Sequence, residues 1–381
     1  MNSGDKLYIW QQDTWPKWTY AHTRLAPLLA QVHHAQGLLL GRMHDIGLEQ
    51  RDQATLRVLT EDVIKTSEIE GEMLNPESVR SSIAHRLGVD IGENSEVEAP
   101  TDRHVDGVVD MVLNATQQHD QALTVPRLCG WHAALFPTGY SGMTPIRVGA
   151  WRNDAQGPMQ VVSGPSYRPR VHYQAPPANT LNAEMALFLD WFNAASQDDP
   201  LIKAGLAHLW FVTVHPMDDG NGRMGRAVGD LLLARAESEH YVGGTAQRYY
   251  SLSAQIQRER KDYYNQLERT QKGTLDVTDW LEWFLGCLLR AVQGAQGTLS
   301  AVLSKANFWR QWADTPMNER QIKLLNKLLD RFDGKLTTSK WATIAKCSQD
   351  TALRDINELL ERGVLMRSEA SGRSTSYEVR S

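Results

Sequence analysis

The twelve residues HPMDDGNGRMGR, His215–Arg226, set the first constraint on both fold and chemistry. They bring one histidine, two carboxylates, three glycines, one asparagine and two arginines into one short stretch. Pro216 disfavours helix at the residue before it, so the apolar run LWFVTV should form a helix that ends at His215. The glycines then give a tight turn, and we expect a new helix from about Arg223 to residue 238.

This turn and the helix after it predict an anion pocket. Backbone N–H groups point out of a helix N-terminus, and glycines let a phosphate approach them closely. Arg223 and Arg226 both project from the first turn and suit phosphate oxygens by charge and geometry. Asp218 and Asp219 are candidate Mg²⁺ ligands, and His215 is a candidate general base. Together these groups indicate nucleotidyl or phosphoryl transfer, whereas either half of the stretch alone is typical of an ordinary turn.

The whole stretch resembles the Fic motif, HPFx(D/E)GNGRxxR, of protein adenylyltransferases. The departure is Met217, where the family usually has phenylalanine, and methionine fills apolar gaps adaptably. The resemblance implies that His215 deprotonates a Ser, Thr or Tyr hydroxyl of a target protein. It further implies that Asp219 binds the Mg²⁺ (or Mn²⁺) of ATP. Phosphate binding is assigned by the resemblance to Gly220, Asn221, Gly222, Arg223 and Arg226.

Position 222 bears on the type of reaction. A Fic relative that phosphorylates its target has a lysine there, whereas this chain has Gly222. The resemblance therefore implies transfer of AMP from ATP to a protein hydroxyl, with loss of pyrophosphate. The sequence does not name the target protein, and modification of the protein itself is a further expectation.

A second motif lies upstream, at residues 66–71. TSEIEG fits the pattern (S/T)xxxE(G/N) of the inhibitory helix found in many Fic proteins. The resemblance implies that Glu70 pairs with Arg226 and denies it to the γ-phosphate, because one guanidinium cannot bind two anions bidentately. Some relatives use this glutamate to remove AMP, so de-AMPylation is a hypothesis that Glu70 motivates.

The rest of the chain predicts a mainly α fold. Helical periodicity covers 22–47, 50–69 and most of 179–312, whereas residues 144–173 are rich in Gly and Pro and predict a small β-hairpin. In the family such a hairpin is a flap that docks the target as an added strand. An ordinary surface hairpin is the alternative. The flap residues would be Met159, Gln160, Val161 and Val162.

The C-terminal residues 301–381 have a different character. They carry 14 Lys and Arg against 10 Asp and Glu, a net charge of +4, whereas the remainder carries −9. Their order of three helices and two short β-like pieces is that of a winged helix-turn-helix. A DNA-binding winged helix and one that binds protein or forms dimers are both compatible with this charge. Candidate DNA contacts are Ser348, Thr351, Arg354 and Arg373.

The expected domains are an N-terminal helical region with the inhibitory helix (1–95), a Fic catalytic domain (96–300) and the winged helix (301–381). The polar tract 90–102 is the expected linker. The chain has 381 residues, 41% of them hydrophobic, and shows neither a secretory signal nor an apolar run of membrane-spanning length. We therefore expect a cytoplasmic enzyme without membrane contact, and a homodimer by family analogy. The rival hypothesis is a DNA-binding transcription regulator whose Fic core senses ATP.

Overall fold

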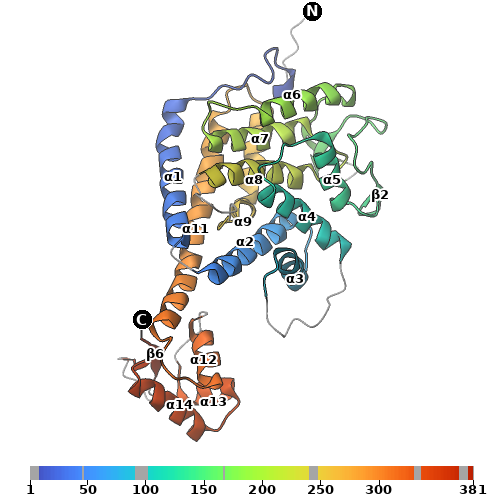
Figure 1. Ribbon diagram of the computed structural model, residues 1–381. Helices are drawn as coiled ribbons and strands as arrows, with labels where there is room; N and C mark the ends of the chain where they lie inside the picture. Colours follow the sequence, from blue (N-terminus) through green and yellow to red (C-terminus); the bar gives the residue numbers. More distant parts are fainter. Residues whose placement is uncertain are drawn as a thin grey trace, which may run out of the picture. The chain divides into compact units, whose positions relative to one another are not determined.

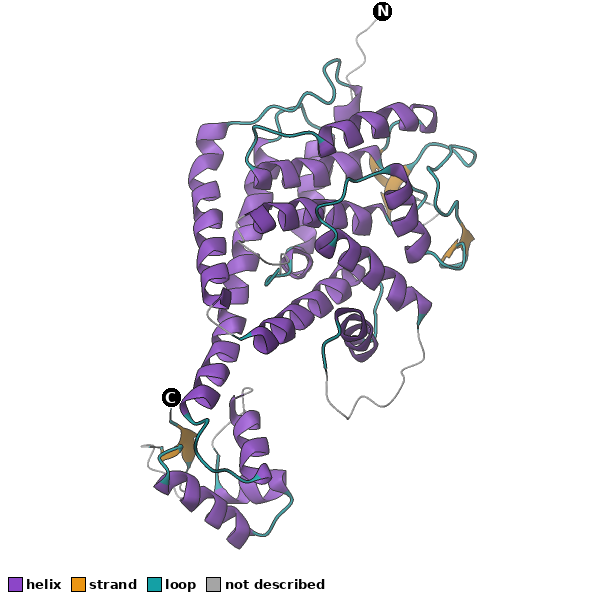
Figure 2. Ribbon diagram, in the orientation of Figure 1, coloured by secondary structure: helices purple, strands orange, loops and turns teal. Residues whose placement is uncertain are grey.

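The computed structural model describes residues 8–44, 47–90, 102–165, 168–239, 248–329, 336–368 and 376–380. Within these ranges the fold is mainly helical, with three small antiparallel strand pairs (Figure 1, Figure 2). The expected mainly α class is therefore confirmed. The chain divides into two compact units: the described parts of Met1–Met43 with Arg51–Ala295, and those of His44–Gln50 with Gln296–Ser381.

The centre of the first unit is the helix pair α7 (Pro200–Val214) and α8 (Asn221–Glu239). Every residue of α7 after Pro200 is buried, which is typical of a helix that is hydrophobic all round. Glycines let the two helices approach closely: a Cβ added to Gly225 would lie 2.5 Å from Val212 Cγ1. This packing fixes the turn between the two helices, which carries the motif.

The helices α4 (Arg103–Gln117), α5 (Val125–Leu135) and α6 (Leu181–Asn193) pack against this pair, and α3 (Pro76–Leu87) packs against α4 (Figure 1). The expected helices are present, with ends displaced by a few residues; α1 ends at His44 rather than 47, and α8 begins at Asn221 rather than 223. The unit also contains α1 (His22–His44), α2 (Leu48–Ile69), α9 (Leu252–Arg258), α10 (Arg260–Gln271) and the part of α11 (Thr278–Gln311) up to Ala295. Helix α4 lies outside the tracts in which helix was expected.

Local sequence explains several helix ends. The Asn75 side chain accepts a hydrogen bond from Ser78 N, and Thr124 caps α5 in the same way through Arg127 N. Gly71 has φ +87°, a left-handed conformation that favours glycine, and it follows the end of α2. The expected linker 90–102 lies almost entirely outside the described residues.

The expected flap is the hairpin of β3 (Gln160–Ser163) and β4 (Arg170–Gln174), with a register shift between Val161 and Val162. A short N-terminal segment around η1 (Ile9–Gln11) packs against this hairpin. Tyr8 packs edge-on against Tyr173 with ring centroids 5.3 Å apart, and Trp10 Nε1 donates to Gln174 O. Two more short strands, β1 (Tyr140–Ser141) and β2 (Thr144–Pro145), form a separate pair, and η3 (Ala178–Thr180) leads into α6.

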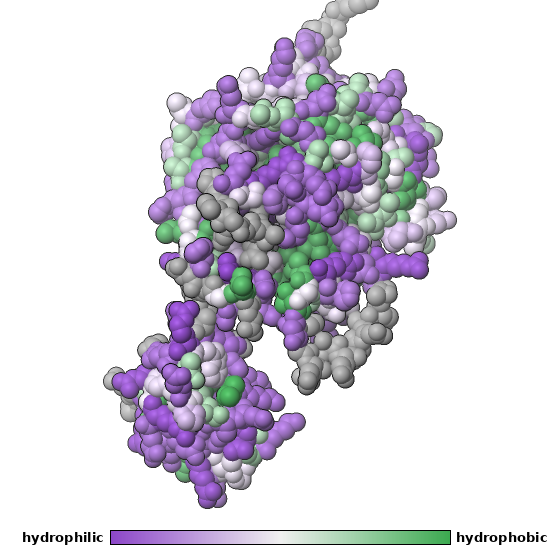
Figure 3. Space-filling view, viewed as in Figure 1, coloured by the Kyte–Doolittle hydropathy of each residue, from purple (hydrophilic) through white to green (hydrophobic). Residues whose placement is uncertain are grey.

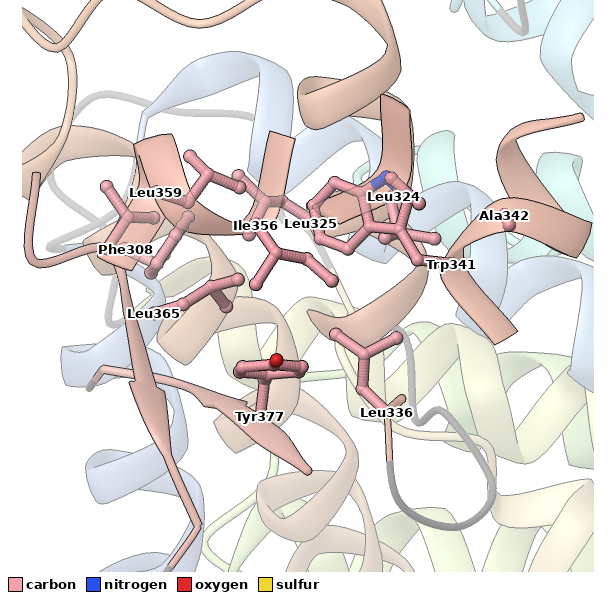
Figure 4. Close-up of a cluster of buried hydrophobic side chains, with 12 residues drawn as sticks. Phe308, Leu324, Leu325, Leu336, Trp341, Ala342, Ile356, Leu359, Leu365 and Tyr377 are labelled. Atoms are coloured by element: carbon pink, nitrogen blue, oxygen red, sulfur yellow. The ribbon is translucent and has the colours of Figure 1, made fainter. Parts of the chain in front are cut away.

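The second unit has its own hydrophobic core (Figure 4). Trp341, Ile356 and Leu359 are fully buried in it, together with Leu325. The element order is helix, helix, helix, strand, strand, as the sequence indicates; whether this is a functional winged helix stays a prediction. Its face in Figure 3 is largely hydrophilic. The elements are α12 (Glu319–Leu329), α13 (Thr338–Ala345), α14 (Gln349–Glu361), β5 (Leu365–Arg367) and β6 (Tyr377–Val379).

None of the helices among the described residues is both long enough and apolar enough to cross a membrane.

Candidate active site

His215 stands at the end of α7, in the left-handed conformation, with φ 52°. Its Nδ1 lies 3.1 Å from Val212 O. A carbonyl oxygen can only accept, so Nδ1 carries the proton of the neutral ring and Nε2 keeps its lone pair. Burial lowers the pKa of His215, in part offset by the bond to Val212. The ring is therefore a neutral base near pH 7, with Nε2 as the proton acceptor.

Arg152 donates hydrogen bonds to the backbone of His215 and Pro216. Its Nε donates to His215 O at 2.8 Å, and its backbone N donates to Pro216 O at 2.9 Å. The side chain is fully buried, and a second bond from Nη2 to Pro176 O ties it to the segment after the flap. Arg152 is a positioning residue that the sequence analysis missed, because an arginine within a Gly- and Pro-rich tract gives no periodic signal.

The turn after His215 is stabilised by hydrogen bonds between its own residues. The Asn221 side chain accepts from Met217 N and donates to Met217 O, both at 2.9 Å. Met217 is fully buried, as expected for the apolar anchor that replaces the usual phenylalanine. Gly220 has φ +76°, and a Cβ there would lie 2.9 Å from the Phe136 ring. Asn221 thus shapes the turn, and Gly220 allows its close approach to Phe136.

The two carboxylates of the motif have different partners. Asp218 accepts a 2.7 Å hydrogen bond from Arg147 N, which ties the turn to the loop before the flap. Asp219 accepts from Gly220 N at 2.6 Å and from the Ser141 hydroxyl. No group of three or more His, Cys, Asp or Glu side chains in the described ranges would hold a metal by itself. A single carboxylate beside a phosphate pocket nevertheless fits Mg²⁺, which is usually bound by one or two carboxylates and substrate phosphates.

Arg226 is paired with Glu70, as the resemblance implied. Its Nη2 lies 2.8 Å from Glu70 Oε1, and the Arg226 side chain is 2% exposed. Thr66, the first residue of the upstream motif, also binds this arginine through its hydroxyl and its carbonyl, each at 2.8 Å. The Glu70 carboxylate lies against the start of α8, because a Cβ on Gly222 would be 2.2 Å from Glu70 Oε1.

Arg223 is also bound to a carboxylate, which the sequence analysis did not predict. Its Nη1 lies 2.6 Å from Glu72 Oε2, and its guanidinium lies over the Phe136 ring, 5.2 Å from the ring centre. His104 Nε2 is 3.2 Å from the same Glu72 oxygen. The bond from His104 and the charge of Arg223 lower the pKa of Glu72 against the opposing effect of burial. Glu72 therefore remains ionised beside the motif.

The end of α2, which lies directly before both carboxylates, is anchored to α10. Arg260 Nε donates to Ile69 O at 2.7 Å, and the Tyr264 hydroxyl donates to the same oxygen at 3.3 Å. Two buried N–H donors, Arg223 Nε and Arg226 Nη1, have no hydrogen-bond partner among the described residues. The start of α8 is thus an anion site. It holds two carboxylates, and two buried N–H donors beside it are still without a partner among the described residues.

The remaining predicted residues lie elsewhere. In the flap, Met159 and Val161 pack against the cluster of Tyr8, Tyr173 and Ala175, whereas Gln160 and Val162 are exposed. In the second unit, the Ser348 hydroxyl caps α14 by accepting from Thr351 N, and Arg354 is exposed on the same helix. Arg373 lies outside the described residues. DNA binding by this unit stays a prediction.

Comparison with known families identifies the central domain. Residues 122–233 match the model of the Fic/DOC family, so the chain contains a Fic/DOC domain. Residues 8–89 match a domain of unknown function, DUF4172. The chain also resembles a crystal structure of a Fic family protein from Desulfovibrio desulfuricans G20 over 96% of this chain and 98% of that one, with a TM-score of 0.56 and 21% identity. That likeness supports the shared fold.

Two curated relatives are named as adenylyltransferases. Protein adenylyltransferase fic-1 of Caenorhabditis briggsae is 40% identical over 55 residues, 14% of this chain and 11% of that protein. Protein adenylyltransferase Fic of Drosophila willistoni is 26% identical over 220 residues, 56% of this chain and 40% of that protein. The matched regions thus span less than half the length of either relative.

Proposed function

We propose that this protein is an adenylyltransferase that transfers AMP from ATP to a Ser, Thr or Tyr hydroxyl of a protein. The proposal rests on one observation: a candidate base and an anion site lie on the two sides of a single turn. His215 ends α7 with Nε2 available, and α8 begins six residues later with two buried arginines, each bound to a carboxylate. The names of the two curated relatives support the same activity.

In this mechanism, the chain positions the reactants and stabilises charge. Arg223 and Arg226 would bind the phosphates that Glu72 and Glu70 now mimic. The Nε2 atom of His215 would take the proton of the incoming hydroxyl, whose oxygen then bonds to the α-phosphorus while pyrophosphate leaves. Asp219 would hold Mg²⁺ or Mn²⁺, which supplies neutralisation of the phosphate charge when bound with ATP. Arg152 keeps His215 in place.

Autoinhibition follows from the same contacts. The Glu70 carboxylate occupies the position against Gly222 and Arg226 that a phosphate needs, so ATP and Glu70 exclude each other there. Thr66 holds Arg226 independently of Glu70, so the arginine stays in place when the carboxylate leaves. We further propose de-AMPylation as a second reaction, with Glu70, which lies at the start of α8, as its base.

The test uses purified full-length protein, Mg²⁺ and a cell lysate, with ATP labelled at either the α- or the γ-phosphate. The variants are wild type, Glu70→Gly and His215→Ala in the Glu70→Gly background. We expect protein label from α but not γ, increased in Glu70→Gly and lost with His215→Ala. Label from γ would mean kinase chemistry instead. Absence of label in every variant would favour the rival regulator that senses ATP.

A further inference from the structure

The last turn of α7 contains two carbonyl oxygens whose usual partners are missing. In a helix, each carbonyl accepts a hydrogen bond from the N–H group four residues later. For Val212 O that residue is Pro216, which has no N–H. For Thr213 O it is Met217, whose N–H donates to the Asn221 side chain instead. Both Val212 and Thr213 are buried, so their carbonyls require other donors.

Two side chains supply those donors. His215 Nδ1 donates to Val212 O, so the orientation of the ring depends on the position of this turn. The Tyr173 hydroxyl, on β4 of the flap, donates to Thr213 O at 2.7 Å. Gln271 Nε2 contacts the same turn through longer bonds, 3.4 Å to Val212 O and 3.3 Å to Thr213 Oγ1. The bond from Tyr173 therefore contributes more than either of these to fixing the end of α7.

Tyr173 is itself firmly held on the buried side of the flap. Its side chain is 1% exposed, and burial raises its pKa, so the hydroxyl keeps its proton and acts as a donor. The Tyr8 ring packs edge-on against it, and Trp10 Nε1 donates to the carbonyl of the next residue, Gln174. The N-terminal segment thus fixes Tyr173, and Tyr173 connects the flap to the turn that carries the candidate base.

The competing explanation is that Tyr173 only packs. Its ring would hold the flap against the helices, and its hydroxyl would add nothing to the reaction. Packing requires the ring but not the oxygen, whereas a role at the end of α7 requires the oxygen. Replacement by phenylalanine removes the oxygen alone and so separates the two explanations.

We propose that Tyr173 is a positioning residue for His215: its hydroxyl fixes the end of α7, so that Nδ1 stays on Val212 O and Nε2 stays unprotonated. The proposal rests on the adenylyltransferase function proposed above. Without the hydroxyl, Thr213 O is a buried acceptor that has lost its donor from β4, and the last turn shifts. The bond from Nδ1 weakens, and a ring protonated on Nε2 becomes populated. That tautomer cannot take the proton of the incoming hydroxyl through Nε2.

The first experiment compares full-length Glu70→Gly protein with and without Tyr173→Phe. The initial rate of AMP transfer from α-labelled ATP to lysate proteins should fall about tenfold at saturating Mg²⁺-ATP, because a displaced base loses part of its contribution. Affinity for a non-hydrolysable ATP analogue, measured by titration calorimetry with Mg²⁺, should change by less than about twofold, since the phosphate site is untouched. Tyr250→Phe is the matched control, because Tyr250 is also buried but its hydroxyl donates to Glu237 on α8.

The second experiment observes the ring directly and needs no turnover. In nitrogen-15 NMR spectra of histidine-labelled protein, the His215 signals are assigned by their absence in His215→Ala. We expect the Nδ1-protonated form to predominate in Glu70→Gly and to lose population to the Nε2-protonated form when Tyr173→Phe is added. Tyr250→Phe should leave the tautomer, the rate and the affinity at their parent values.

An unchanged rate in Tyr173→Phe would overturn the proposal, because the hydroxyl would then be dispensable. A fall in rate matched by an equal fall in nucleotide affinity would also overturn it, because the hydroxyl would then only stabilise the fold. An unchanged tautomer would overturn it whatever the rate. If no variant transfers AMP, the proposed function fails, and the NMR result alone decides whether Tyr173 positions the ring.

Discussion

The two arginines at the start of α8 look alike in sequence but are held differently. Arg226 donates three bonds to α2 and the residue after it: two to Thr66 and one to Glu70. Arg223 forms an ion pair with one carboxylate, that of Glu72, and its guanidinium lies over the ring of Phe136. Arg226 is therefore pre-organised even without its carboxylate, whereas the position of Arg223 depends more on Glu72.

The two carboxylates differ as well. Glu70 forms an ion pair with Arg226 and lies against Gly222, at the start of α8. One carboxylate oxygen of Glu72 contacts both Arg223 and His104. The Glu72 side chain is 36% exposed, whereas that of Glu70 is 29% exposed. From this difference we propose that Glu70 blocks the phosphate position, whereas Glu72 mainly neutralises charge at its edge.

The largest effect is expected from Glu70→Gln. A hydrogen bond between charged groups contributes about 1.5–3 kcal/mol, and Glu70 is partly exposed, so its loss should raise ATP affinity about tenfold. Titration calorimetry with Mg²⁺-ATP in a His215→Ala background measures this without turnover. Glu68→Gln is the control, because Glu68 pairs with Lys65 on the same helix and not with the motif. Equal affinity in wild type and Glu70→Gln would contradict the blocking role.

Glu72→Gln should have a smaller effect in the same assay. A partly exposed ion pair contributes about 0.5–1 kcal/mol, which corresponds to about a two- to fivefold gain in ATP affinity. The double variant Glu70→Gln, Glu72→Gln then shows whether the two carboxylates act separately. If Glu72→Gln weakens binding instead, Glu72 positions Arg223 for the phosphate, and our ranking of the two residues is wrong.

The pH dependence of transfer provides a finer comparison. The active form of His215 is neutral, and burial lowers its pKa below the ordinary 6.5, while Glu70 raises it slightly. The rate in the Glu70→Gly variant should therefore stay constant down to pH 6.5 and fall only as the pH drops through the lowered pKa. A pH–rate profile at saturating ATP checks this. An acid limb centred above pH 6.5 would show that the base is not the buried histidine.

The smallest effect concerns His104. Its hydrogen bond to Glu72 raises its pKa, so the folded state binds the proton more tightly than the unfolded chain. This stabilisation is fully present below pH 6.5 and is lost as the pH rises through the raised pKa. Wild type should therefore unfold at a slightly higher temperature than His104→Asn at pH 6, with the difference gone near pH 9. A difference that persists unchanged at pH 9 would mean that packing, not charge, is responsible.

The grouping of His215 with Arg223 and Arg226 was predictable from the sequence because these residues are close along the chain. A helix that must end before Pro216, a glycine turn and a second helix place His215 and both arginines together without any long-range information. The Glu70–Arg226 pair spans 156 positions, and it was predictable only through the resemblance of residues 66–71 to a known motif. Its presence in the structure shows that the motif carried real spatial information.

The missed residues share a physical reason. Glu72 follows the end of a helix and Arg152 lies in an irregular tract, so neither has a periodic signal. Their contacts join parts of the chain that are distant in sequence, such as the ion pair of Glu72 with Arg223. Helix ends shifted by a few residues for a related reason, because capping contacts rather than composition fix them.

The central claim is that Glu70 occupies the phosphate position at the start of α8. The most direct measurement is a crystal structure of Glu70→Gly with Mg²⁺ and a non-hydrolysable ATP analogue. Our account predicts phosphate oxygens against Gly222 and Arg226, where the Glu70 carboxylate lies in the wild-type chain, with the α-phosphorus facing His215 Nε2. A nucleotide bound elsewhere, with the start of α8 still free of phosphate, would contradict it.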